Sequence, residues 1–393
     1  MQDIVTFSLY FLHCIRSETE TPVSMKWIAS INLFLNYNSL LHRKRVVFYF
    51  LLATSPLAVL QAQPDVPQEE SLFDYLSKSG QLIELTIKTD MDEMINNRRR
   101  ADYQPAALLY TDAQGEEIEW EIGVVPRGNY RRRICDFPPI RLNFSRSELA
   151  QSKLNPEFDK LKMVTHCLDE KEDEDFVLKE YLAYKLYNQL TPNSYRVQLV
   201  RATYLDTEGK YRKIRRFAIL IEETDELAHR LGGAECETMG QPADSIAIAE
   251  ENLMAVFQYM LGNEDWSIIM LRNVKLIRPN DGGRLIPVPY DFDFSGFVNT
   301  PYAVANSQLG LSHVKQRIFL GNAAEKEQLR ETLAHFRRHR NHLRSIIDDF
   351  KWLNFSVRTN AIEYIDSFYD MERDLMKENA QKHKDKKAGS AQN

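Results

Sequence analysis

The residues best suited to chemistry in this sequence are four polar side chains between residues 262 and 297. Asp265 and Asn273 come first, and Asp291 and Asp293 follow in the run RLIPVPYDFDFSGF. In an extended segment, residues two apart point to the same side, so Asp291 and Asp293 are expected to share one solvent-facing side. Two carboxylates on one wet face are typical of a site where magnesium is held by a few oxygens. The pattern therefore predicts magnesium ligands at Asp291 and Asp293.

The order of these residues adds a second interpretation. Asp265, Asn273 and Asp291 follow the order of the base, the amide and the metal-binding aspartate of a protein-kinase catalytic loop. Asp265 would then orient or deprotonate an acceptor hydroxyl, and Asn273 would help Asp291 to hold magnesium. The alternative is that acidic residues beside aromatic ones only end strands, since a single carboxylate is usually a solvated loop residue.

A helix and a hairpin are expected to position the four residues. Apolar residues from Leu253 to Leu261 repeat at helical spacing, so a helix over 246–261 leads the chain toward Asp265. The stretch Leu285–Phe294 has the β-branched and aromatic content of a strand. The turn Pro279–Gly283 precedes it, which predicts a hairpin.

The same segment resembles the spore coat protein H (CotH) kinase-like family. That family carries an Asn-x-Asp-Trp loop, a downstream Asn, and an Asp-x-Asp followed by an aromatic residue and a glycine. Here these stand at 263–266, Asn273 and 291–296. The stretch from Asp265 to Asn273 is longer than in the general kinase pattern. A Gly-rich kinase loop and a His-Arg-Asp motif do not occur, and this family is known for lacking them.

The resemblance covers roughly residues 80–350. It implies an α+β, two-lobed protein-kinase-like fold with an antiparallel-sheet N-terminal lobe and a mainly helical C-terminal lobe. We expect the N-terminal β-rich lobe at 79–225 and the C-terminal lobe at 226–378, with the catalytic segment at 262–297 and a charged, frayed tail at 379–393. The implied activity is magnesium-dependent transfer of phosphate from ATP to a protein hydroxyl.

Three further residues are expected to contact the nucleotide. Arg127 follows a predicted strand in an Arg-Gly-Asn run like that of the family, and a guanidinium group suits phosphate. Lys162 lies on a strand predicted over 158–166, as the kinase lysine that holds phosphates does. Glu222 ends an apolar strand at the place where the family contacts adenine. The alternatives are a solvated basic turn, a solvent-facing lysine and a buried strand with an exposed acidic end.

The other elements are read from periodicity and turn residues. Glu180 lies on one of the predicted helices, but the family typically lacks an acid there, so it is kept outside the predicted site. Of the cysteines beyond residue 63, at most one pair can form a disulfide, and none has zinc-ligand spacing. Strands are expected at 82–89, 106–111, 117–125, 138–142, 195–204 and 216–222, and helices at 91–100, 176–190, 325–350 and 357–378.

The first 63 residues have the pattern of a targeting segment. A basic run at 42–45 precedes an apolar run at 46–60, and Ala62 provides a small residue near a cleavage site. This predicts a secretory signal peptide, too short for a comfortable membrane span, preceded by a doubtful extension. A short N-terminal anchor is the alternative. We expect a linker at 64–78 and a secreted, periplasmic or cell-surface protein without a stable membrane span after cleavage.

Composition limits the remaining possibilities. The chain has 393 residues, 44% of them hydrophobic, which is enough for one large domain or two ordinary ones with a real core. A net charge of −6 disfavours nucleic acid as a partner. The family resemblance implies a protein substrate. Two other functions stay open. A surface adhesion or binding protein would suit an exported chain, because ATP is scarce outside the cytoplasm. A metal-dependent hydrolase would use the same carboxylates without an adenine pocket.

Overall fold

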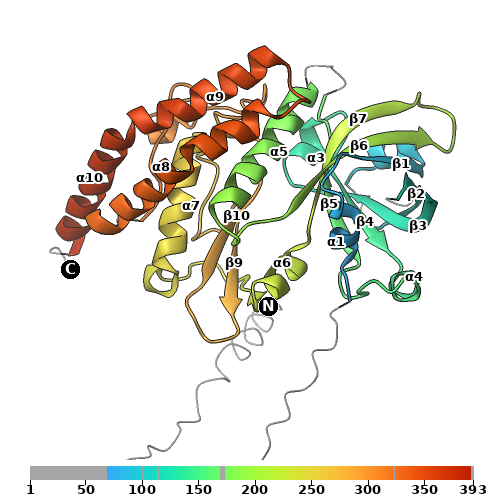
Figure 1. Cartoon of the computed structure of the whole chain (residues 1–393), viewed down its shortest axis with the longest axis horizontal. Coiled ribbons are helices and arrows are strands. Elements are labelled where there is room, and N and C mark those ends of the chain that lie inside the picture. The colour runs from blue at the N-terminus through green and yellow to red at the C-terminus, as the bar shows by residue number, and fades with distance from the viewer. Residues whose placement is uncertain (1–68, 100, 113–114, 169–172, 323, 391–393) are drawn as a thin grey trace, which may run out of the picture. The chain divides into compact units, whose positions relative to one another are not determined.

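The computed structural model describes residues 69–390, apart from residues 100, 113–114, 169–172 and 323. The expected signal peptide lies outside the described residues. Seven strands close a barrel in the order β1-β2-β3-β4-β5-β7-β6 (Figure 1). They are β1 (Ile83–Thr89), β2 (Gln104–Thr111), β3 (Glu117–Pro126), β4 (Ile140–Phe144), β5 (Lys160–Val164), β6 (Val197–Asp206) and β7 (Ile214–Ile221).

The closed barrel contradicts the expected fold. We expected a two-lobed, kinase-like fold whose N-terminal lobe is an open antiparallel sheet, and this expectation is wrong. β1 pairs in parallel with β6, from Ile83 opposite Val200 to Thr89 opposite Asp206, so the sheet is mixed and has no free edge. Alternating apolar residues predict that a strand exists, but they do not predict its distant partner. The closing pair was therefore not visible in the sequence.

Apolar side chains fill the barrel and also come from short helices around it. The helices α2 (Met91–Asn96) and α4 (Arg146–Gln151) each add buried residues to this core. The helix α1 (Leu72–Ser77) does the same, with Ser71 as N-cap: the Asp74 backbone N–H donates to the Ser71 hydroxyl at 3.0 Å. A linker was expected at 64–78, so the structure corrects the part from Leu72 onward.

The helical C-terminal region packs beside the barrel, with α5 (Asp173–Leu190) between them (Figure 1). A small sheet in the order β10-β9-β8 lies next to the helical C-terminal region. Among the described residues, no helix combines the length and apolar character needed to cross a membrane. The elements are α6 (Thr224–Arg230), β8 (Gly233–Glu235), α7 (Ile248–Leu261), β9 (Val274–Pro279), β10 (Ile286–Pro289), α8 (Lys326–Asp348), α9 (Phe355–Asp370) and α10 (Glu372–Ser390).

The last helix replaces the frayed tail that was expected from residue 379. α10 continues to Ser390, and Asn379 is buried within it. The Asn379 side-chain amide donates to the Ala324 carbonyl at 2.8 Å, and its oxygen accepts from the Ala324 N–H at 3.0 Å. A buried polar side chain whose donor and acceptor are both hydrogen-bonded stabilises this part of α10, which the charged sequence alone did not predict.

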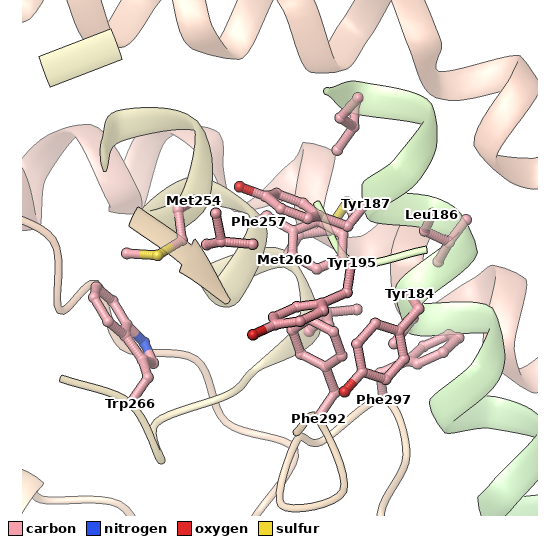
Figure 2. Packing of buried hydrophobic residues seen from close by; sticks show 14 of the residues in the cluster. Tyr184, Leu186, Tyr187, Tyr195, Met254, Phe257, Met260, Trp266, Phe292 and Phe297 are labelled. Carbon is pink, nitrogen blue, oxygen red and sulfur yellow. The ribbon is translucent and has the colours of Figure 1, made fainter. Parts of the chain in front are cut away.

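Aromatic packing joins α5 to the segment that carries the predicted metal ligands. Phe292 is fully buried, and its ring centroid lies 4.8 Å from that of Tyr184 and 5.7 Å from that of Phe257 (Figure 2). Truncating a buried phenylalanine to alanine typically costs about 3–5 kcal/mol. The chain on either side of Phe292 is therefore held firmly against α5 and α7.

Candidate functional site

The segment 262–297, which contains β9 and β10, has two ends that are bonded to each other. Gly296 N–H donates to the Gly262 carbonyl, and Phe297 N–H donates to the Leu261 carbonyl, both at 3.0 Å. Gly262 ends α7 with a φ of +60°, and a Cβ there would lie 2.1 Å from the Tyr364 hydroxyl oxygen. Only glycine fits such a position. The segment is thus closed at a fixed point before its functional residues begin.

Asp291 and Asp293 are positioned by a turn, which corrects the expected strand at Leu285–Phe294. β10 ends at Pro289, and Asp291 has a φ of +63°. A positive φ is uncommon for a residue other than glycine and often occurs at functional sites. Asp291 N–H donates to the Tyr184 hydroxyl at 2.8 Å, and Phe292 is buried beside it. The alternation argument was wrong, although both carboxylates still face one cavity.

Six of the seven residues predicted from the sequence line a single pocket of about 540 Å³. This volume falls in the range of small-molecule binding sites. A cavity of about 630 Å³ elsewhere, between α5, β6 and the end of α8, contains none of the seven. The roles assigned to the six residues stay predictions, but the structure brings together Arg127, Lys162, Asp265, Asn273, Asp291 and Asp293.

Asp265 and Asn273 form one unit on the acidic side of the pocket. The Asn273 amide donates to the Asp265 carboxylate at 2.9 Å and to its backbone carbonyl at 2.7 Å. Arg272 lies 3.1 Å from the other Asp265 oxygen. Burial raises the pKa of Asp265, while Arg272 acts in the opposite direction. Among the described residues, the Asn273 side-chain oxygen has no hydrogen-bond donor, so it is available to a ligand.

Asp293 is the most buried carboxylate of the catalytic segment, with 3% of its surface exposed. Tyr302 donates a hydrogen bond to it at 2.9 Å. Burial raises the pKa of Asp293 well above its usual range, and the neighbouring Asp291 raises it further. A cation between the two carboxylates would offset this repulsion.

The acidic side suits magnesium better than a metal that needs a full set of protein ligands. Among the described residues, no group of three acidic, histidine or cysteine side chains is arranged to hold a metal ion. Magnesium is usually bound by one or two carboxylates, with phosphate and water oxygens completing its coordination. Asp291 and Asp293, with the Asn273 oxygen, match that smaller requirement.

Cations from the barrel line the same pocket. Lys162 on β5 is buried, with its amino group 3.0 Å from the Thr224 hydroxyl and 3.3 Å from the Glu223 carboxylate. Burial lowers the pKa of Lys162 to about 8, although Glu223 acts in the opposite direction. The Arg127 guanidinium has no ion-pair or hydrogen-bond partner among the described residues. Both groups can therefore meet an anion.

Glu222 is the predicted residue that does not line the pocket. It has 0% exposed surface, and its carboxylate lies 2.9 Å from Arg196 and 2.7 Å from Arg230. Ile221 and Glu223, its neighbours in the chain, lie on the pocket side: Ile221 lines the pocket and Glu223 pairs with Lys162. Because neighbouring residues at a strand end point to opposite sides, Glu222 joins a structural ion-pair network instead.

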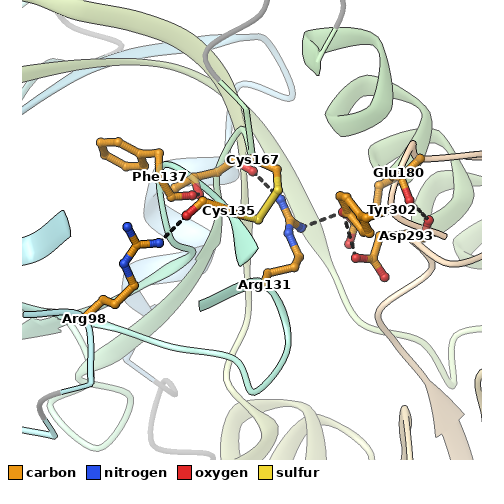
Figure 3. The surroundings of a disulfide bond; sticks show 10 residues. Arg98, Arg131, Cys135, Phe137, Cys167, Glu180, Asp293 and Tyr302 are labelled. Atoms are coloured by element: carbon orange, nitrogen blue, oxygen red, sulfur yellow. Dashed lines mark hydrogen bonds and ion pairs between the residues drawn. A yellow bond between two sulfur atoms is a disulfide. The ribbon is translucent and has the colours of Figure 1, made fainter. Parts of the chain in front are cut away.

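Four charged residues of the pocket were not predicted, and they are Arg131, Arg141, Glu180 and Arg272. Glu180 on α5 is 2% exposed, and its carboxylate lies 3.3 Å from the guanidinium of Arg131, which is also buried (Figure 3). Burial raises the pKa of Glu180, and Arg131 acts against this. Glu180 lies on the apolar stripe of its helix, near Val177 and Tyr181 in the sequence. A charged residue among apolar ones at helical spacing is a signal that could have identified it. Nothing distinguished Arg131 from the arginines that follow it.

No family model matches this chain, and no curated protein matches it. The resemblance to the spore coat protein H family therefore remains a prediction based on the motifs at 263–266 and 291–296. What the pocket does has to be inferred from its own residues.

Proposed function

We propose that this protein is a magnesium-dependent phosphotransferase that moves a phosphoryl group from ATP to a protein hydroxyl. The observation that carries the proposal is that barrel cations and the carboxylates of segment 262–297 line one pocket. A nucleoside triphosphate with its magnesium needs both kinds of group. A metal-dependent hydrolase would use the same carboxylates but needs no adenine pocket.

The acidic side would hold the metal. Asp291 and Asp293 supply two carboxylates, and Asn273 supplies an amide oxygen. When bound there, magnesium neutralises charge on the phosphates and orients them. Asp293 has a structural task as well, since it accepts a hydrogen bond from the Tyr302 hydroxyl and is 3% exposed. Asp291 is the more exposed of the two, so it is the principal ligand of this proposal.

The barrel cations would neutralise the phosphate oxygens. Lys162 meets this need while it is protonated, and the planar guanidinium of Arg127 suits phosphate oxygens. The same pocket includes Val164, Ile221 and Tyr195. Such apolar and aromatic surface suits the planar base of a nucleotide. With the base on this surface and magnesium on the carboxylates, the phosphates would lie between them.

Asp265 would act on the acceptor. It is partly exposed, and Asn273 and Arg272 hold its two oxygens. The acceptor hydroxyl gives its proton to Asp265 as its oxygen bonds to the γ-phosphorus. The bond from that phosphorus to the β–γ bridging oxygen breaks, and ADP leaves. Positioned general bases of this kind contribute roughly a hundredfold to ten-thousandfold.

We also propose that the protein is secreted, periplasmic or on the cell surface. The apolar run at 46–60 supports export. The Cys135–Cys167 disulfide gives independent support, because disulfides form and persist mainly in oxidising compartments.

The proposal is tested by incubating the purified protein with magnesium and γ-labelled ATP, alone and with extracts of exported proteins. We expect label on protein hydroxyls, and we expect it to disappear in the Asp265→Asn variant. Release of free phosphate without protein labelling would indicate a hydrolase. Binding without either product would indicate a non-catalytic binding protein. Each of these results would overturn the proposed transfer.

A further inference from the structure

The segment Arg127–Arg131 forms much of the barrel side of the pocket, and all five of its residues line it. At its first residue, the Arg127 backbone N–H donates to the Pro139 carbonyl at 2.7 Å. The next three residues are exposed, and Gly128 has a φ of +83°. Strand pairing therefore does not hold the middle of the segment, where the Tyr130 ring contacts those of Phe294 and Tyr302, with centroids 5.3 and 6.2 Å away. The geometry of the segment also depends on what fixes its other end.

Arg131 is that other end, and its side chain is buried. Its guanidinium donates to the Thr165 carbonyl at 2.5 Å and lies 3.3 Å from the Glu180 carboxylate. Burial by itself lowers the pKa of Arg131, but the neighbouring phenol of Tyr302 and the nearby carboxylates raise it overall. The side chain thus stays charged and connects the end of β5 to α5.

A disulfide holds the turn that Arg131 begins. Arg131 starts α3 (Arg131–Ile134), and the Cys135 N–H donates to the Arg131 carbonyl at 2.9 Å. Cys135 is bonded to Cys167, two residues beyond Thr165. The disulfide and the Arg131 guanidinium therefore fasten the same turn to the same stretch of chain, 165–167 (Figure 3). These two bonds act on one end of the segment together with the Asp136 and Phe137 N–H groups, which donate to the Cys167 carbonyl at 2.8 and 3.3 Å.

We propose that the Cys135–Cys167 disulfide makes Arg131 a positioning residue of the pocket. While the disulfide is formed, Arg131 holds segment 127–131 against the carboxylate side, and the pocket binds a polyphosphate with full affinity. An external dithiol transfers two electrons and two protons to the pair, which becomes two thiols while the dithiol becomes a disulfide. The segment is then released and affinity falls. The ligand in this inference rests on the proposed function, whereas the release of the segment does not.

The first measurement is calorimetric titration of magnesium–ATP into oxidised and reduced protein. We expect reduction to weaken binding by about ten- to a hundredfold, since displacing a positioned group by about 1 Å can have an effect of that size. The Cys135→Ser/Cys167→Ser variant should bind like the reduced protein and should not respond to the dithiol. Cys236→Ala is the matched control, because Cys236 is a buried free thiol outside the pocket. It should keep the full response to reduction.

The second measurement needs no ligand. Backbone hydrogen exchange of residues 128–134 should become faster on reduction, whereas β9 and β10 should keep their rates. Arg131→Gln should weaken binding in the oxidised protein and remove most of the further loss on reduction, and Arg131→Lys should restore part of the affinity. Unchanged exchange on reduction overturns the inference, even if ATP does not bind and the proposed function fails. Faster exchange with unchanged ATP affinity overturns the positioning role alone.

Discussion

Lys162 gives the sharpest single prediction about the pocket, because its charge is set by burial. Its pKa is lowered to about 8, so it is protonated at neutral pH and loses its charge within the range in which proteins stay folded. If only the protonated form contacts phosphate, about nine tenths of the molecules are competent at pH 7 and about one tenth at pH 9. The dissociation constant for magnesium–ATP should therefore rise about tenfold between these pH values.

The perturbation is Lys162→Met, which keeps the length of the side chain and removes the charge. A hydrogen bond to a charged group contributes about 1.5–3 kcal/mol, which corresponds to a loss of about ten- to a hundredfold in affinity at pH 7. Glu223 would keep Arg141 as a partner at 2.8 Å, so it is not left buried and unpaired. The variant should also lose the pH dependence.

Lys160→Met is the matched control. Lys160 lies on the same strand and pairs with Asp159 at 2.8 Å, but it does not line the pocket. Calorimetric titrations of the three proteins at pH 7, 8 and 9 make the comparison. Equal affinities for wild type and Lys162→Met at pH 7, or the same slope with pH in both, would refute the reasoning.

Three further substitutions separate the roles of the other residues. Asp291→Asn should weaken magnesium-dependent nucleotide binding by about tenfold or more, because a neutral amide is a poorer ligand for a hard cation. Titration at several magnesium concentrations measures this change, and unchanged binding would exclude Asp291 as a ligand. Asp265→Asn should leave nucleotide affinity intact and reduce labelling of the acceptor by about a hundredfold or more, whereas a parallel loss of affinity would place Asp265 with the metal ligands. Glu222→Ala should lower the free energy of unfolding by about 1.5–3 kcal/mol in urea denaturation, because Arg196 and Arg230 lose charged hydrogen bonds to a buried carboxylate, while Arg196 keeps Glu226 as a partner. Its nucleotide affinity should not change at a temperature where it is folded, and a selective loss of affinity would return Glu222 to the site.

Local patterns in the sequence predicted individual elements well. The helix expected at 246–261 is α7, and the hairpin expected around Pro279–Gly283 is formed by β9 and β10. Each depends on residues close together in the chain, whose periodicity and turn chemistry decide the outcome. The parallel pairing of β1 with β6 depends on residues far apart, and the expected fold was wrong for that reason.

The candidate site shows the same difference between local features, which the sequence predicts, and long-range pairings, which it does not. Asp265, Asn273 and Asp291 lie on one closed segment, so their order in the sequence was enough to predict that they meet. The ion pair between Arg131 and Glu180 joins two distant segments, and the sequence around either residue does not indicate that they form a pair. Glu222 was assigned from its place after an apolar strand, but the strand ends with that side chain pointing away from the pocket.

Titration of ATP with and without magnesium tests the central claim most directly. The claim is that the barrel cations and the carboxylates of segment 262–297 hold one magnesium nucleotide between them. Calorimetry on the oxidised protein should show one binding event with magnesium, and an affinity lower by about tenfold or more in excess chelator, which corresponds to at least ~1.4 kcal/mol. Equal affinity under both conditions would contradict the metal site. No binding under either condition would contradict the nucleotide site altogether.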